Sequence, residues 1–99
     1  MIVTVKPYLF LREAMGTKEI RLELPENTTV ADLIAELAEH YGLPESFESK
    51  SGSLVFFDRE VISGLIILID GRNINLLNGK DTVLKESSVI TLFPPAAGG

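Results

Sequence analysis

Hydrophobic and polar residues alternate with a period of two in the first quarter of the chain, as is typical of strands that bury one face. In residues 3–12 the inward, odd positions are Val3, Val5, Leu9 and Leu11, and the positions between them are Thr4, Lys6, Tyr8, Phe10 and Arg12. Pro7 interrupts this run and predicts an edge position or a bulge, because proline has no N–H group. After a turn at 15–17, Ile20, Leu22 and Leu24 alternate with charged residues and predict an antiparallel partner for the first strand.

Residues 30–41 follow a helical period instead. Their apolar side chains recur at the spacing of one helix face: Val30, Leu33, Ile34, Leu37, Ala38 and Tyr41. Thr29 and Asp32 resemble a capping box, in which two side chains satisfy each other's backbone N–H groups. Gly42 stands where helices commonly end, and Pro44 prevents continuation. We expect this to be the one main helix.

The segment 43–64 gives weaker signals. Its residues 44–47 are compatible with one helical turn, and residues 49–53 are small and polar, as is typical of a loop. Residues 54–57 fit either an extra short strand or a cover over one end of the core, and the pattern does not decide between the two.

The last third of the chain predicts three more strands. Residues 65–69 are apolar at every position and predict a strand buried on both faces. Asp70-Gly71 is typical of a two-residue hairpin turn, so residues 72–74 begin the return strand. Residues 78–81 indicate a loop, and Val89–Phe93, β-branched and aromatic, a final strand. We expect the first and last strands to pair in parallel at the centre of a mixed sheet, with the helix across one face.

The final strand leads into the tail Pro94-Pro95-Ala96-Ala97-Gly98-Gly99. Two prolines without N–H groups end the pairing of the strand and favour an extended path. Such a tail would reach roughly 15–20 Å at about 3.1 Å per residue. Because its other residues are small, it could enter a narrow channel and bring its terminal carboxylate to another protein's backbone. A frayed terminus is the ordinary alternative.

Composition bounds the class of protein. A chain of 99 residues with 45% hydrophobic content predicts one domain, residues 1–93, followed by the functional tail, residues 94–99. The net charge of −5 and the scattered basic residues argue against nucleic-acid binding. The acidity suits either plain solvation of the surface or attraction to a basic partner surface. The chain has no cysteine, which removes disulfides and thiolate nucleophiles. We expect a cytoplasmic protein, because neither a signal peptide nor a membrane span is evident.

The chain offers no catalytic constellation of its own. Gly79-Lys80-Asp81 lacks the hydroxyl residue and the leading glycine of a phosphate-binding loop. His40, the only histidine, stands near the end of the predicted helix, where an imidazole interacts favourably with terminal carbonyls. No cluster offers metal ligands. The terminal carboxylate remains, and it becomes an acylating group only after conversion to an acyl-adenylate. The ATP site for that step must therefore belong to another enzyme.

The tail Phe93-Pro94-Pro95-Ala96-Ala97-Gly98-Gly99 resembles that of the ubiquitin-like sulfur-carrier proteins, above all the small subunit of molybdopterin synthase and the small archaeal modifier proteins. Leu11-Arg12-Glu13 with Gly16, residues 29–33 and residues 70–74 add to the resemblance. It implies an α+β, β-grasp fold with a mixed sheet of about five strands. It also implies that a ubiquitin-activating-type enzyme adenylates Gly99 with ATP, after which Gly99 becomes a thiocarboxylate. No cofactor is expected on the chain itself.

The resemblance further implies a large catalytic subunit as partner. In a molybdopterin synthase the tail of the small subunit enters the large subunit's active site, where its sulfur forms the dithiolene of the pterin. The tail residues bound there would be Phe93, Pro94, Pro95, Ala96, Ala97 and Gly98. The partner surface falls on the outward side of the sheet, which by alternation means Tyr8 and Phe10, with Arg12 facing a partner carboxylate. The alternatives are aromatic packing against the loop around Phe56 and Phe57, and a plain surface arginine.

Two other functions stay open at this point. The long, serine-rich segment 43–57 leaves room for a modifier that is joined through Gly99 to lysines of other proteins, or that donates sulfur to transfer RNA. A non-covalent binding module with an incidental tail is the third possibility. The Pro-Pro pair favours molybdopterin synthesis over the sulfur carrier of thiazole formation.

Overall fold

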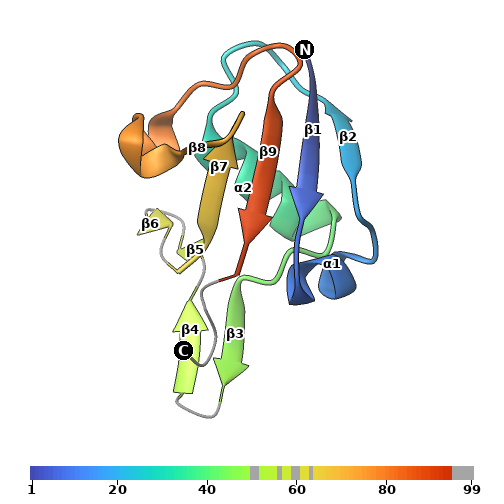
Figure 1. Cartoon of the computed structure of the whole chain (residues 1–99), viewed down its shortest axis with the longest axis vertical. Helices are drawn as coiled ribbons and strands as arrows, with labels where there is room; N and C mark the ends of the chain where they lie inside the picture. Colours follow the sequence, from blue (N-terminus) through green and yellow to red (C-terminus); the bar gives the residue numbers. More distant parts are fainter. Residues whose placement is uncertain (50–51, 56, 59–60, 63, 95–99) are drawn as a thin grey trace.

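The computed structural model describes residues 1–49, 52–55, 57–58, 61–62 and 64–94, and only the backbone between 47 and 62. Its centre is a five-stranded mixed sheet with the order β2-β1-β9-β7-β8 (Figure 1). These strands span Ile2–Pro7 (β1), Ile20–Glu23 (β2), Ile66–Ile69 (β7), Arg72–Asn73 (β8) and Val89–Phe93 (β9). β1 and β9 pair in parallel, with Val5 beside Ile90, and the other neighbours are antiparallel. The expected central parallel pair is therefore confirmed.

The main helix, α2 (Val30–His40), crosses one face of this sheet (Figure 1). At its start the Asp32 N–H donates to Thr29 Oγ1 at 3.2 Å, and the Thr29 N–H donates to Asp32 Oδ2 at 3.1 Å. Gly42 follows the helix with a left-handed φ of 79°. A Cβ at Gly42 would lie 3.2 Å from the Ala14 carbonyl oxygen, so glycine also permits a close approach of the chain there. The predicted helix, its capping box and its stop are confirmed.

Replacing the N-cap side chain tests this local account. We expect Thr29→Ala to lower the free energy of unfolding by about 1 kcal/mol, because it removes the acceptor for the Asp32 N–H and half of the reciprocal pair. Thr29→Ser keeps the hydroxyl and should stay near the parent value. Urea unfolding at unchanged m-value measures both, and equal stability of all three proteins would contradict the capping account.

The core lies between α2 and the inner face of the sheet. Both layers contribute side chains with no measurable exposure: Val3, Val5, Val30, Leu33, Ile34, Leu37, Ile90 and Leu92. The β7–β8 turn at Asp70-Gly71 has positive φ at both residues, 50° and 86°, as the primed hairpin turn requires. The predicted hairpin is confirmed.

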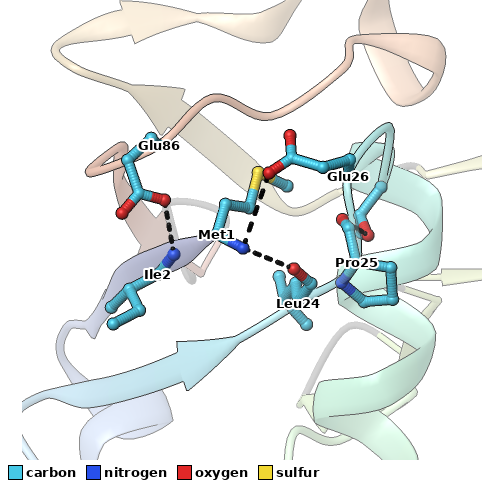
Figure 2. Close-up of polar contacts among 7 residues, drawn as sticks. Met1, Ile2, Leu24, Pro25, Glu26 and Glu86 are labelled. Carbon is cyan, nitrogen blue, oxygen red and sulfur yellow. Dashed lines mark hydrogen bonds and ion pairs between the residues drawn. The ribbon is translucent and has the colours of Figure 1, made fainter.

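Two segments, residues 24–26 and the residues around Glu86, hold the start of β1 (Figure 2). The Met1 ammonium donates to the Leu24 carbonyl at 2.8 Å and lies 3.8 Å from Glu26 Oε1. The Ile2 N–H donates to Glu86 Oε2 at 2.8 Å. The Glu86 carboxylate thus satisfies a strand N–H group at the point where β9 has not yet begun.

The largest departure from the sequence prediction is at residues 8–15. β1 ends at Pro7, and the chain enters a short helix, α1 (Phe10–Met15). Leu9 has a φ of 56° and is 69% exposed, so its predicted inward position is wrong. Leu11 is fully buried as predicted, but from the helix. The left-handed backbone at Leu9 breaks the alternation, which is why the strand pattern failed there.

The edge position predicted at Pro7 is confirmed locally, because β1 lies between β2 and β9 but β2 does not pair with it at Pro7. The N–H groups of Thr4 and Tyr8 point toward β9, so the position of the missing proline N–H faces β2. β2 pairs with β1 only as far as Val5. The absent donor therefore costs no ladder bond.

Other corrections concern the middle of the chain and β7. Ser46–Ser49 (β3) and Gly52–Val55 (β4) form an antiparallel hairpin, so the helical turn expected at 44–47 is wrong, and much of the loop expected at 49–53 is strand. For the predicted segment 54–57, residues 54–55 belong to β4, and Phe57 begins Phe57–Asp58 (β5), which pairs with Val61–Ile62 (β6). Phe56 lies outside the described residues. Short 3-10 turns, η1 (Ile74–Leu76) and η2 (Gly79–Asp81), follow β8.

β7 buries one face only. Ile67 is 1% exposed, whereas its neighbour Ile66 is 40% exposed. The expectation of a strand covered on both faces is therefore wrong, because α2 covers one face of the sheet while Ile66 stands on the other.

Candidate functional site

Two aromatic rings stack where β1 and β9 end. Phe93 is the last residue of β9, and Tyr8 follows β1 directly. Because the two strands run in parallel, their carboxyl ends meet at one edge of the sheet. The ring centroids lie 4.9 Å apart with an interplanar angle of 21°. The Tyr8 N–H donates to the Leu92 carbonyl at 3.0 Å, so the backbone fixes the tyrosine beside the strand that leads into the tail.

Arg12 joins this stack from α1. Its guanidinium carbon lies 5.1 Å from the centroid of the Tyr8 ring, a cation–π distance. Its Nε–H donates to the Pro7 carbonyl at 3.5 Å. Within the described residues Arg12 has no carboxylate partner, so the other guanidinium donors are available for one on another protein. The fold thus brings together three residues that the sequence separates by up to 85 positions, from Tyr8 to Phe93.

Phe10 does not belong to this stack. It lies in α1 and packs, half-buried, against the core. Its predicted place on the outward side of the sheet is wrong, because the strand has ended before it. A role for Phe10 in partner binding stays a prediction.

Ile66 belongs to the same outward surface, and sequence reasoning missed it. It is paired directly with Phe93 in the β7–β9 register, and paired residues share a face of the sheet. Its 40% exposure leaves an aliphatic side chain beside the stacked rings. We call Tyr8, Arg12, Ile66 and Phe93 the tail-base surface. An apolar centre with a cation on it is the usual composition of a protein-binding site.

The tail begins at this surface. Pro94 is buried, so its ring anchors the start of the tail on the domain. β9 ends at Phe93, in agreement with the two prolines that follow. Pro95, Ala96, Ala97, Gly98 and Gly99 lie outside the described residues, and their predicted roles in tail binding and thiocarboxylate formation stay predictions. The alternative packing of the aromatics against Phe56 and Phe57 also concerns side chains outside the described part.

Among the residues that the structure describes, no group of three or more His, Asp or Glu side chains is arranged to hold a metal ion. In the same residues, no helix has the length and apolar character needed to cross a bilayer.

Comparison with known proteins identifies the family. Residues 9–99 match the model of the ThiS family. The chain is 32% identical to small archaeal modifier protein 3 of Haloferax volcanii over 100 residues, which cover all of both chains. The solution structure of small archaeal modifier protein 1 from Methanosarcina acetivorans superposes with a TM-score of 0.71 and 31% identity, over 99% of this chain and 96% of that one.

A third relative carries a different name. A Pyrococcus furiosus protein, provisionally named molybdopterin converting factor, subunit 1, superposes with a TM-score of 0.71 and 28% identity, over 97% of this chain and 99% of that one. These likenesses confirm the predicted β-grasp fold and the predicted resemblance to sulfur carriers and archaeal modifiers. The match over most of the chain, together with the mixed sheet and its crossing helix, shows that the chain belongs to the ThiS family of ubiquitin-like proteins.

Proposed function

We propose that this chain is a sulfur carrier that works in the cytoplasm as the small subunit of a molybdopterin synthase. The family consists of small, non-catalytic carriers, and one relative bears the name of a molybdopterin converting factor. The observation that carries the proposal is the position of the tail-base surface. The Tyr8–Phe93 stack and Arg12 lie where the glycine-ended tail begins, so one partner can hold the domain while the tail reaches into its active site.

The chemistry belongs to the terminal carboxylate of Gly99 and to the partners. A partner activating enzyme joins that carboxylate to the AMP portion of ATP and releases pyrophosphate, which gives the acyl carbon a good leaving group. Hydrosulfide then attacks the acyl carbon, AMP departs with the carboxylate oxygen, and a thiocarboxylate remains. The large subunit passes this sulfur to the pterin. The carrier therefore contributes a reactive end and a docking surface, and it holds no cofactor.

Intact mass spectrometry tests the proposal. The chain is incubated with ATP, sulfide and the activating enzyme from its own source. We expect a mass gain equal to the difference between one sulfur and one oxygen atom, located at Gly99 by fragmentation. A sample without ATP is the control. An unchanged mass, under conditions in which the enzyme forms the adenylate, would overturn sulfur carriage.

A second function is favoured by the names of two relatives, both small archaeal modifier proteins. In this alternative a lysine amine attacks the same acyl-adenylate, or an ester derived from it, and forms an isopeptide bond with Gly99. Higher-mass adducts that depend on Gly99 would support it. Their absence from cells grown under sulfur limitation or oxidative stress would count against it.

The stack gives a further prediction for partner binding. We expect Tyr8→Ala to lower kcat/KM for adenylation about tenfold, because it removes the ring that contacts Phe93 and the platform under Arg12. The change should lie in KM, since the reacting carboxylate is untouched. Tyr8→Phe keeps the ring and should stay close to the parent. Steady-state kinetics with the activating enzyme measures both variants, and an unchanged KM for Tyr8→Ala would show that the tail-base surface does not bind that enzyme.

A further inference from the structure

A hollow of about 600 Å³ lies at the other end of the sheet from the tail. Its walls are the end of β7, the β7–β8 turn, the segment after η2 and Ser88, the residue before β9. β9 runs away from this hollow toward the tail-base surface (Figure 1). From Ser88 to Phe93 the distance is roughly 17 Å, at about 3.3 Å per residue. The hollow is therefore separate from the surface already described.

The lining combines aliphatic and cationic side chains. Ile69, Leu77 and Val83 supply the apolar part, and Val83 is 48% exposed. Arg72 and Lys85 supply two positive charges. Neither has an ion-pair partner among the residues that the structure describes. With Asp70 as the one acidic residue of the lining, the hollow carries a net positive charge in a chain whose net charge is −5.

The wall side chains of Asp70, Thr82 and Ser88 are already engaged within the fold. The Val89 N–H donates to Asp70 Oδ1 at 2.9 Å, and the Lys85 N–H donates to Ser88 Oγ at 3.2 Å. The Asn78 N–H donates to Thr82 Oγ1 at 3.0 Å. These bonds fix the walls before anything binds, which lowers the ordering cost of association. The two cations and the aliphatic groups remain available to a ligand.

We propose that this hollow binds an extended, acidic segment of a partner protein, with a carboxylate on Arg72 and Lys85 and an aliphatic side chain on Ile69, Leu77 and Val83. Charge complementarity selects an acidic occupant. A singly charged carboxylate fits better than a phosphate dianion, because the Asp70 carboxylate stands in the wall and the wall contains no long helix N-terminus. A second copy of this acidic chain is disfavoured by its own net charge.

The hollow lies at the opposite end of the sheet from the tail-base surface, so the two surfaces can bind partners at the same time. A partner bound there leaves the tail-base surface uncovered, so it can hold the carrier while the tail reacts elsewhere. Such a partner can bind whether the tail carries sulfur or forms isopeptide bonds, because the hollow and the tail-base surface are different surfaces with different recognition chemistry.

Nuclear magnetic resonance on the 15N-labelled full chain tests it. The probe is the blocked peptide acetyl-Val-Asp-Val-Glu-Val-amide, and its Asn/Gln counterpart is the neutral control. We expect saturable shifts at the amides of Arg72, Asn78, Lys85 and Ser88, and about tenfold weaker binding of the neutral peptide. The double variant R72E/K85E should lose about tenfold or more in affinity, since it replaces attraction by repulsion. K18E/R21E changes the net charge equally, outside the hollow, and should bind like the parent.

Five outcomes would overturn the proposal. Shifts centred on other residues, or equal losses in R72E/K85E and K18E/R21E, would show no specific role for the hollow. Equal affinity of the neutral peptide would remove the carboxylate from the recognition. Tighter binding of inorganic phosphate to the same amides would make it a phosphate site. Sedimentation of the parent chain as a dimer that R72E/K85E dissociates would make the occupant a second copy.

Discussion

A chain that stops at Ala97 is expected to form no detectable thiocarboxylate while it keeps its fold. Loss of Gly98 and Gly99 withdraws the reacting carboxylate by roughly 6 Å, at about 3.1 Å per residue of extended chain. Misplacement of a reacting group by about 1 Å already costs on the order of a hundredfold in rate. The new terminus would also bear a Cβ where the natural tail has none, which hinders a close approach to another backbone.

This truncation should not change the stability of the fold. The core is complete at Leu92, and the last buried residue that the structure describes is Pro94. The denaturation midpoint of the shortened chain should therefore equal that of the parent, while intact mass spectrometry finds no sulfur on it. A full-length chain with Ala96→Ser and Ala97→Ser keeps the length and both glycines and should load normally. Normal loading of the shortened chain would refute the role of Gly99.

The second large effect concerns the short helix that the sequence did not predict. We expect Leu11→Ala to lower the free energy of unfolding by roughly 2–5 kcal/mol, through lost burial and the cavity left behind. Leu11 has no exposed surface and is the buried residue of α1. A domain of this size has about 5–15 kcal/mol in all, so the loss is a large share of it. Guanidinium unfolding of parent and variant measures the difference.

Leu9 provides the matched comparison two residues earlier. It is 69% exposed and its φ of 56° lies in a region that side chains with a Cβ rarely adopt. Leu9→Gly should therefore raise the free energy of unfolding by about 1 kcal/mol, because relief of the strain exceeds the entropy cost of glycine. If Leu11→Ala cost less than about 1 kcal/mol, or Leu9→Gly were strongly destabilising, α1 would not pack as described.

The elements whose signals are local could be predicted from the sequence. α2 combines an apolar face, a reciprocal cap at Thr29 and Asp32, and a glycine stop, and all three were confirmed. The Asp70-Gly71 turn was equally clear, because few residue pairs accept two positive φ values in succession.

The alternating pattern gave a wrong strand prediction at residues 8–12, because the positive φ of Leu9 turns the chain out of the strand there. Leu9 and Leu11 continue the pattern of Val3 and Val5, and nothing in residue type marks Leu9 as left-handed. The stop of α1 was visible in part, since Gly16 has a φ of 71° and its N–H donates to the carbonyls of Arg12 and Glu13. The same residue was interpreted as a turn, because six helical residues are too few to show a period.

The tail-base surface could be predicted only in outline. Tyr8 and Arg12 were expected on the outward partner surface and Phe93 at the base of the tail, but the contact between Tyr8 and Phe93 was not predicted. The position of Arg12 over the tyrosine ring depends on α1, and the exposure of Ile66 depends on which face of β7 is left uncovered. The sequence of β7 does not show which face is exposed, because its residues are aliphatic at every position and isoleucine lies on both the buried and the exposed face.

The place of β9 between β1 and β7 has a consequence for folding during synthesis of the chain. Thr4 lies beside Val89, so β1 cannot pair with β9 until almost the whole chain has been synthesised. A nascent chain interrupted before Phe93 has two open strand edges and an uncovered apolar layer, which quality-control proteases and chaperones recognise. Such fragments cannot form the Tyr8–Phe93 stack, so only chains synthesised through their last strand present the complete tail-base surface.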